Sequence, residues 1–330
     1  MKNMKCIHVL LQITVLLFII NGCSNHKKNA ATRQVITSFY PVEIIVLNIT
    51  RDIPGIDVSM LTPPGTGCLH DYQLTPVDMG KIEKADCMVI NGAGMEPFLE
   101  KIIHEKSNLT LIDASVKCDL LHNEDEPGHH EEKEPDLHSE KKNHHGEKEH
   151  HHSDINPHVW LSPAQYLIQI QTVAQGLALC DSAHATLYLK NMDNYSQEIR
   201  QLQSELDTLL KNLPNRDIVT FHAAFSYFAK DYNLNVRAVI QQEPGQEPSA
   251  SELANLIRII KQYNIRSVFV EPQYRSKTAD VLSRETGVHV DTLDPVVTGE
   301  LTPDAYIKAM RKNGTILCNA LKREVPANGN

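Results

Sequence analysis

Three histidines lie where packing in a hydrophobic core does not explain them, and imidazole is a common zinc ligand. His70 lies in a Pro/Gly-rich loop directly after a predicted strand, His158 precedes a predicted helix, and His222 ends another predicted strand. Open α/β sheets bind ligands beyond the carboxyl ends of their strands, where such loops emerge. Any one of these histidines is more typical of a hydrogen-bonded structural residue. If all three converge, they form a nitrogen-rich site suited to Zn²⁺.

A carboxylate or a thiol could complete such a site. Asp291 ends the last predicted strand and Asp294 follows it; we favour Asp294 because it lies farther past the strand, although Asp-Pro is equally typical of a turn. Cys68, two residues before His70, could ligate a metal, but we expect an ordinary loop thiol. The cysteines show no C-x-x-C spacing, so no disulfide framework is predicted.

Short apolar runs alternate with helical stretches in two parts of the chain. In the first part the predicted strands are Gln34–Thr37, Ile56–Leu61, Cys87–Asn91 and Leu109–Asp113, and the predicted helices are Pro41–Asp52, Pro76–Lys84 and Glu96–Glu105. In the second part the predicted strands are Ile218–Phe221, Leu234–Ile240, Ser267–Val270 and Val288–Asp291, and the predicted helices are Ala223–Tyr232, Ser249–Tyr263, Ser276–Thr286 and Pro303–Leu321. Helices from Pro163 to Cys180 and from His184 to Leu213 separate the two parts. This alternation predicts an α/β protein with two parallel sheets.

The first residues are typical of a secretory signal. Lys2 and Lys5 precede an apolar run from Ile7 to Ile20. As a helix this run would span about 21 Å, short of the roughly 30 Å hydrocarbon core, so a transmembrane helix is the weaker interpretation. The sequence around Cys23 resembles a bacterial lipobox, which predicts that Cys23 is lipid-modified; a plain signal peptide with an incidental cysteine is the alternative.

Residues 122–154 have a composition unlike the rest of the chain. They contain eleven acidic residues against four lysines, which accounts for −7 of the net charge of −9. Such a segment cannot bury enough apolar surface to offset its chain entropy, so we expect disorder. Eight of its histidines are candidate low-affinity metal ligands: His129, His130, His138, His144, His145, His150, His151 and His152.

The overall charge and composition argue against nucleic-acid binding. The net charge is −9 and aromatic residues make up only 5% of the chain, so the sequence offers neither a basic stripe for phosphates nor a set of stacking platforms. We therefore divide the chain into a leader at 1–22, a tether at 23–33, an N-terminal lobe at 34–162 with the insertion at 122–154, a linking helix at 163–180 and a C-terminal lobe at 181–325.

Five motifs in a fixed order carry a family resemblance. They are His70–Asp78, Asn91–Glu96, Asn156–Pro163, Phe221–Phe228 and Phe269–Tyr274. Between about Val35 and Leu321 the chain resembles the zinc- and manganese-binding solute-binding lipoproteins of ABC importers (cluster A-I), most closely the zinc-specific branch. The resemblance implies two βαβ, Rossmann-like lobes joined by a long rigid helix, with the metal in the cleft between them. It also implies four ligand positions, which are His70, His158, His222 and Asp294.

The resemblance implies a function and has three departures that bear on it. Asn156 stands where the family usually has Asp, which predicts a weaker hydrogen bond to a ligand but leaves the ligand itself. Leu69 stands where some zinc members carry an acid, so Asp294 or water must fill the fourth position. His222 stands where manganese members more often carry Glu. Three nitrogens and one oxygen favour Zn²⁺, with manganese or another divalent metal as the alternative. The implied protein is an exported, membrane-anchored, monomeric lipoprotein that captures Zn²⁺ and delivers it to an ABC permease. Its His-rich insertion would capture or sense zinc, unless it is a solvated spacer.

A zinc hydrolase is the main alternative from another class, because three histidines and a water also build a catalytic site. The sequence contains no HExxH or GxSxG motif, and a bound Asp294 would close the open position. Glu243 and Glu271 could be proposed as general bases, but Glu271 is better explained as the start of a strand-to-helix turn. We therefore expect no enzyme. A surface adhesin of the same fold would differ in its partner and not in its chemistry.

Overall fold

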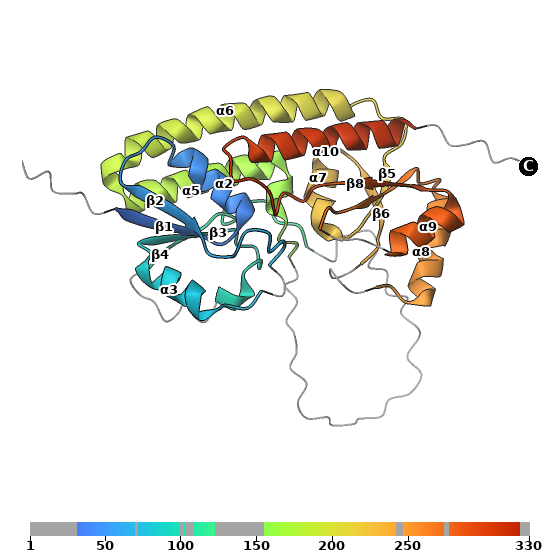
Figure 1. Ribbon diagram of the computed structural model, residues 1–330. Coiled ribbons are helices and arrows are strands. Elements are labelled where there is room, and N and C mark those ends of the chain that lie inside the picture. The colour runs from blue at the N-terminus through green and yellow to red at the C-terminus, as the bar shows by residue number, and fades with distance from the viewer. Residues whose placement is uncertain are drawn as a thin grey trace, which may run out of the picture.

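The computed structural model describes residues 32–69, 72–99, 102, 109–122, 155–241, 247–273 and 277–323. In these residues the chain forms two α/β lobes that lie side by side (Figure 1). Outside the described residues lie the leader, residues 23–31 of the tether with Cys23, and also His70, Glu243 and the eight histidines of the insertion. No helix in the described part is long and apolar enough to cross a membrane.

The N-terminal lobe is built on a four-stranded parallel sheet with the strand order β2-β1-β3-β4. Its strands are β1 (Arg33–Thr37), β2 (Ile56–Met60), β3 (Cys87–Ile90) and β4 (Thr110–Asp113). Its helices are α2 (Tyr40–Ile49), α3 (Pro76–Lys84), η1 (Pro97–Leu99), η3 (Val159–Leu161) and α5 (Pro163–Cys180). Val and Ile in the central strands are buried because helices cover both faces of the sheet.

The C-terminal lobe repeats this arrangement with the strand order β6-β5-β7-β8. Its strands are β5 (Asp217–Thr220), β6 (Asn235–Val239), β7 (Ser267–Val270) and β8 (His289–Thr292). Its helices are η5 (Ala223–Phe225), α7 (Ser226–Asp231), α8 (Ala250–Gln262), α9 (Lys277–Thr286) and α10 (Ala305–Lys322). In this sheet β6 lies on one side of β5 and β7 on the other, so β5 and β7 flank a topological switch point, where such folds bind ligands.

The predicted fold class and most of the predicted elements are confirmed. A capping box begins α8, because Ser249 Oγ accepts from Glu252 N and Glu252 accepts from Ser249 N. The helix predicted from Ala223 begins as the 3₁₀ helix η5 before it continues as α7. Of the helix predicted over Glu96–Glu105, the structure describes little beyond the 3₁₀ helix η1.

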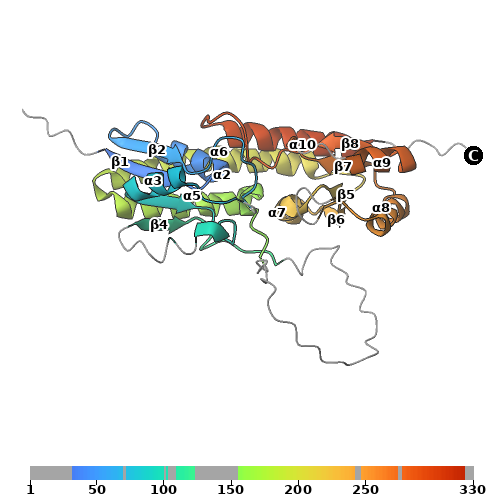
Figure 2. The same ribbon diagram turned by 60° about the horizontal axis from the view of Figure 1, so that its bottom comes forward.

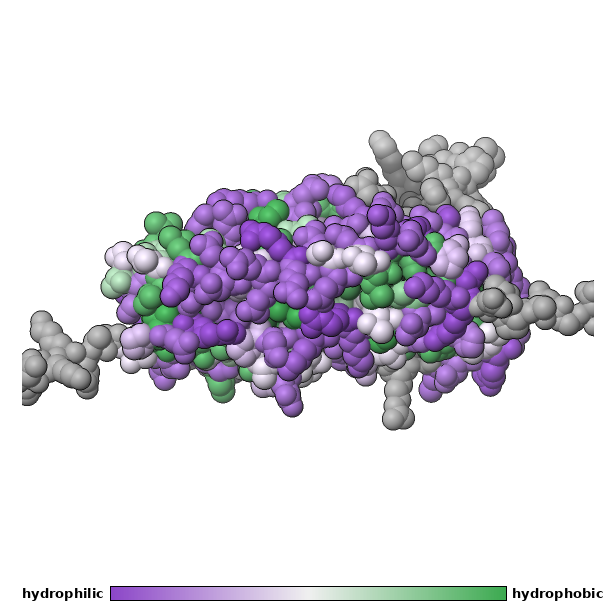
Figure 3. Space-filling model, turned by 90° about the horizontal axis from the view of Figure 1, so that it is seen from above, coloured by the Kyte–Doolittle hydropathy of each residue, from purple (hydrophilic) through white to green (hydrophobic). Residues whose placement is uncertain are grey.

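The helix that runs across both lobes is α6 (Ala185–Leu210), which follows the short 3₁₀ helix η4 (Ser182–His184) (Figures 1 and 2). Helix α5, expected from the sequence to be the linker, instead packs on the N-terminal sheet. A Cβ built on Gly176 of α5 would lie 2.7 Å from Ile112 Cγ1 of β4, so the absence of a side chain permits this close approach. The surface over α6 and α10 is mostly hydrophilic, which suits a solvated face (Figure 3).

Buried hydrogen bonds join the two lobes around Trp160, which is fully buried. Trp160 Nε1 donates to the carbonyl of Pro295, and Tyr306 Oη donates to the carbonyl of Trp160, both at 2.8 Å. The rings of Tyr166 in α5 and Tyr306 in α10 stack with their centroids 3.7 Å apart. One hydrophobic cluster therefore continues from the first lobe into the second, and it holds the loops between the lobes in place.

Candidate metal centre

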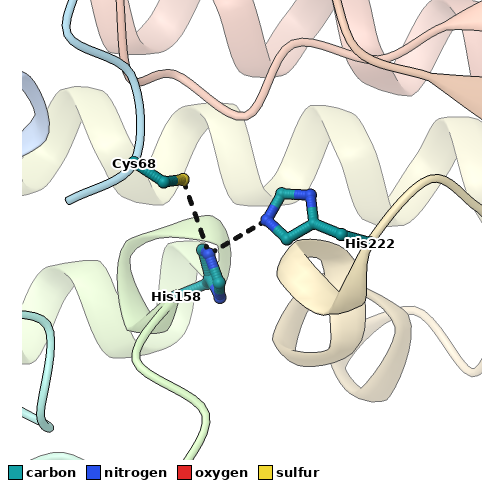
Figure 4. A group of neighbouring side chains, drawn as sticks. All are labelled: Cys68, His158 and His222. Carbon is teal, nitrogen blue, oxygen red and sulfur yellow. Dashed lines mark hydrogen bonds between the residues drawn. The ribbon is translucent and has the colours of Figure 1, made fainter. Parts of the chain in front are cut away.

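Three potential metal ligands from separate parts of the chain meet between the lobes. The Sγ atom of Cys68 and one ring nitrogen each of His158 and His222 lie within 4.8 Å of one another. Cys68 comes from the loop after β2, His158 from the loop before η3, and His222 from the carboxyl end of β5. The three side chains point toward a common centre (Figure 4). We refer to them as the Cys68–His158–His222 cluster.

The ring of His158 is fixed by Asn156. Asn156 Oδ1 lies 3.0 Å from His158 N and 2.9 Å from His158 Nδ1, while Asn156 Nδ2 donates to the carbonyl of Ala223. Since this amide nitrogen is committed to a carbonyl, Oδ1 must accept from Nδ1–H. His158 is then the tautomer whose Nε2 carries a lone pair directed at the cluster. Asn156, which stands where the family usually has Asp, thus still accepts a hydrogen bond from His158 Nδ1.

The loop that carries His158 is anchored by the Asn91–Glu96 motif. Asn91 Nδ2 donates to the carbonyl of Pro157 at 2.9 Å, and the Glu96 carboxylate accepts from the backbone N–H groups of Asn91 and Gly92. Gly92 has a φ of +77°, and a Cβ there would lie 1.9 Å from Asp113 Oδ1, so this position requires glycine. Burial raises the pKa of Glu96 to about 7 despite these hydrogen bonds.

The ring of His222 is fixed by Glu271. His222 follows β5 and Glu271 follows β7, and these strands are neighbours in the sheet, so both side chains reach the same end of it. Glu271 Oε1 accepts from His222 Nδ1, and both residues are buried, with 2–3% of their surface exposed. Burial alone would lower the pKa of His222, but the charge of Glu271 and the contact with Cys68 outweigh it and raise that pKa to about 10.

The two imidazoles face each other through their Nε2 atoms, which are 3.2 Å apart. The Nε2 of His158 carries a lone pair. A neutral His222 that donates Nδ1–H to Glu271 would direct a second lone pair at it, so the contact is favourable only with a positive charge on or between the two rings. In the metal-free protein a proton on His222 meets this need, in agreement with its raised pKa. A cation bound to both nitrogens meets it as well. Two tetrahedral Zn–N bonds of about 2.05 Å would put the nitrogens roughly 3.3 Å apart, close to the spacing found.

Cys68 completes the cluster on the side of the N-terminal lobe. Its Sγ lies 3.6 Å from His158 Nε2. Burial raises the pKa of the thiol, while a hydrogen bond with His222 acts in the opposite direction. The adjacent Leu69 is fully buried in the core, which holds the backbone of Cys68 against the site.

The two candidate aspartates differ in their surroundings. Asp291 accepts from Arg323 and Ser267, so its carboxylate is committed to other partners. Asp294 Oδ1 accepts from Val296 N at 2.8 Å, and burial together with the charge of Glu271 raises its pKa. The Asp294 carboxylate does not lie within 4.8 Å of all three cluster atoms.

Two residues that the structure brings to this centre received little weight from the sequence alone. The sequence favours an ordinary loop thiol at Cys68 over a metal ligand, because no spacing motif links Cys68 to partners that are distant in sequence. Glu271 was treated as a turn residue or a candidate base, whereas its carboxylate orients His222. The order of strands in a doubly wound sheet would have placed the end of β7 beside His222 and was the available signal.

The described residues nearest to the His-rich insertion are tied to the site. His122 and Ile155 form an isolated antiparallel bridge, so the insertion leaves and rejoins the fold at one point, three residues before His158. Tyr227 Oη accepts from Leu121 N and donates to the carbonyl of Asn156, which fixes this junction against the C-terminal lobe.

A fold of two parallel α/β lobes with imidazoles converging between them is typical of metal-binding solute-binding proteins. The family described as zinc-uptake complex component A, periplasmic, matches residues 35–320. The chain belongs to this family, which confirms the resemblance inferred from the five motifs.

Named relatives agree with this membership. The zinc-binding lipoprotein AdcA of Streptococcus pneumoniae (strain R6) is 31% identical, and the alignment covers 98% of this chain and 62% of that protein. The high-affinity zinc uptake system protein ZnuA of Bacillus subtilis is 30% identical, over 83% of this chain and 82% of that protein. A Zn(II)-bound variant of AdcAII from S. pneumoniae has a TM-score of 0.73 at 27% identity, covering 88% of this chain and 98% of that one. The chain thus spans less than two thirds of the length of AdcA.

Proposed function

We propose that this protein is the extracytoplasmic zinc-binding component of an ABC importer, which captures Zn²⁺ between its lobes and delivers it to a membrane permease. The observation that carries the proposal is the pair of buried imidazoles, each held by an acceptor at Nδ1, with their Nε2 atoms 3.2 Å apart. His158 and His222 are two of the proposed ligands. His70, outside the described residues, remains the predicted third histidine, and Asp294 remains the sequence prediction for a carboxylate ligand.

Zinc is the proposed metal because the donors are imidazole nitrogens. Manganese prefers carboxylate, carbonyl and water oxygens, and Glu271 uses its Oε1 atom to hold His222. The same contact argues against hydrolysis, because Glu271, one of the two candidate general bases, orients a ligand. Membership in a family of zinc-uptake components favours transport as well.

The proposed place of action is outside the cytoplasmic membrane. The predicted signal and the lipobox around Cys23 support export and anchoring by lipid. AdcA, the relative named above, is described as a lipoprotein. Replacing Cys23 by alanine should move the protein from the membrane fraction to the soluble exported fraction. Retention in the membrane fraction would contradict the anchor.

Metal analysis of the purified chain tests the proposed zinc site. After dialysis against a weak chelator that strips loosely held metal, we expect one zinc per chain in the wild type and a large loss in His158→Ala and His222→Ala. His289→Ala is the matched control, since His289 is an exposed histidine of β8 outside the cluster. Full zinc content in both cluster variants would refute the proposed site.

The His-rich insertion is proposed to capture zinc near the deep site. Its many histidines are mostly neutral above a pH of about 6.5 and can bind metal weakly in many geometries. The bridge between His122 and Ile155 brings its ends close to the His158 loop, which supports a short transfer path. Deleting residues 129–152 should slow zinc uptake at limiting zinc but not at high zinc. Unchanged uptake at limiting zinc would reduce the insertion to a spacer.

A further inference from the structure

We propose that Cys68 is itself a ligand of the bound metal, so that a thiolate sulfur binds beside the imidazoles of His158 and His222. This inference rests on the proposed zinc function. It adds a sulfur ligand to the predicted ligands, which are histidines and an aspartate. It concerns the described cluster alone.

The distances in the cluster fit a tetrahedral zinc with one sulfur. With a Zn–N bond of about 2.05 Å, a Zn–S bond of about 2.3 Å and tetrahedral angles, the nitrogen and sulfur should lie roughly 3.6 Å apart. The distance from Cys68 Sγ to His158 Nε2 is 3.6 Å. The His158–His222 nitrogen pair fits the same geometry, and the third distance, from Cys68 to His222, lies within 4.8 Å. Both distances given for the cluster therefore agree with a tetrahedral zinc, and the third pair lies no farther apart than 4.8 Å.

The backbone around Cys68 holds the thiol at this position. Gly67 adopts a φ of +81°, a conformation that L side chains rarely adopt, and Leu69 is fully buried. Cys68 is thereby fixed between a turn that glycine permits and an anchored core residue. The other described cysteines (Cys87, Cys118, Cys180 and Cys318) belong to no comparable group of potential ligands among the described residues.

A thiolate in the shell affects which metal is held. Soft sulfur ligands favour zinc, whereas manganese prefers hard oxygen donors. Cys68 therefore supplies discrimination against manganese from within the protein. With Cys68, His158 and His222 bound, one tetrahedral position remains.

Cobalt substitution tests the inference directly. Co²⁺ occupies zinc sites, and a cysteine thiolate bound to it gives an intense sulfur-to-cobalt charge-transfer absorption in the near ultraviolet. Cobalt bound by histidines alone, including those of the insertion, gives none. We expect this absorption when one equivalent of Co²⁺ is added to the wild-type chain, its loss in Cys68→Ser, and its retention in Cys118→Ser, a half-buried loop thiol.

The possible outcomes separate this inference from the proposed function. If the wild type binds Co²⁺ with the weaker bands of nitrogen ligation but no sulfur absorption, Cys68 is not a ligand and the zinc site stands. If the absorption persists in Cys68→Ser, another thiol is responsible and the inference is wrong. If the wild type retains neither cobalt nor zinc after dialysis against a weak chelator, the proposed function and the inference fail together. The first and third outcomes need only the wild-type protein, so folding of the variant is not a condition for them.

Discussion

Replacing Glu271 by glutamine tests how far the neighbour of a ligand determines zinc affinity. Glu271 accepts from His222 Nδ1, and both residues are almost fully buried, so bulk solvent does not compete for this contact. It orients the ring and makes Nε2 a stronger donor. Loss of such a partner typically lowers metal affinity by about 10- to 100-fold, or roughly 1.4–2.8 kcal/mol.

The structure places the expected effect of Glu271→Gln near the lower end of this range. The glutamine carbonyl can still accept from Nδ1, so the orientation of the ring is kept and only the charge is lost. The carboxylate also favours a proton on His222 in the metal-free protein, and part of its benefit to zinc is cancelled by that competition. We therefore expect about a tenfold loss for Glu271→Gln and a larger loss for Glu271→Ala, up to about 100-fold.

The assay is a competition titration of zinc against a chromophoric chelator at fixed pH and ionic strength. Asp291→Asn is the matched control, because Asp291 lies in β8, the strand next to β7, but its carboxylate accepts from Arg323 and Ser267. Its zinc affinity should stay at the wild-type value. Folded Glu271→Gln and Glu271→Ala proteins with wild-type affinity would refute the argument that Glu271 supports a zinc ligand.

Three further predictions concern the contact between α6 and α10, the buried carboxyl of Glu96 and the role of Asp294. Gly314→Ala should lower the free energy of unfolding in urea by about 1–3 kcal/mol, because the new Cβ would lie 2.2 Å from Leu206 Cδ2. Gly80→Ala in α3 is the control: its Cβ meets no atom within 4 Å, so it should raise the free energy of unfolding by about 0.4–1 kcal/mol. Equal effects of the two substitutions would contradict the close contact of α6 and α10. Burial raises the pKa of Glu96 from 4.5 to about 7, so the folded state binds the carboxyl proton more tightly than the unfolded state does. As the pH rises from 4.5 through 7, the metal-free protein should therefore lose about 3 kcal/mol of its free energy of unfolding from this group. Glu96→Gln should lack that part of the pH dependence, and equal slopes in chemical unfolding between pH 4.5 and 8 would show that Glu96 is not responsible. Asp294→Asn should change zinc affinity little if Cys68 occupies the shell; a loss of tenfold or more by competition titration would favour the sequence prediction that Asp294 is a ligand.

The sequence predicted helix boundaries well where capping residues and prolines determine the backbone conformation. The boundaries of α3 and α5 match the predicted ones, because Thr75 and Ser162 cap helices that begin with proline. The role of α5 was not predictable in the same way. Its packing on β4 depends on the contact of Gly176 with Ile112, and such a contact between distant residues leaves no periodic signal.

The site was predictable to the extent that strand ends position it. His222 was found because it lies where a loop leaves a sheet, and His158 because it precedes a predicted helix; the structure brings them together. Cys68 could not be assigned from one sequence, because its role depends on which loops become neighbours in space. Glu271 could be assigned only through the strand order that a doubly wound sheet implies. Asn156 shows the opposite case, because a departure from the usual motif residue keeps the hydrogen bond that the motif needs.

The most direct test of the account is a crystal of the zinc-loaded protein measured at the zinc absorption edge. We predict an anomalous peak between the lobes, about 2.0–2.1 Å from Nε2 of both His158 and His222. A strongest peak that contacts neither imidazole, in crystals with zinc bound at one equivalent, would contradict the central claim that these two residues share the ion.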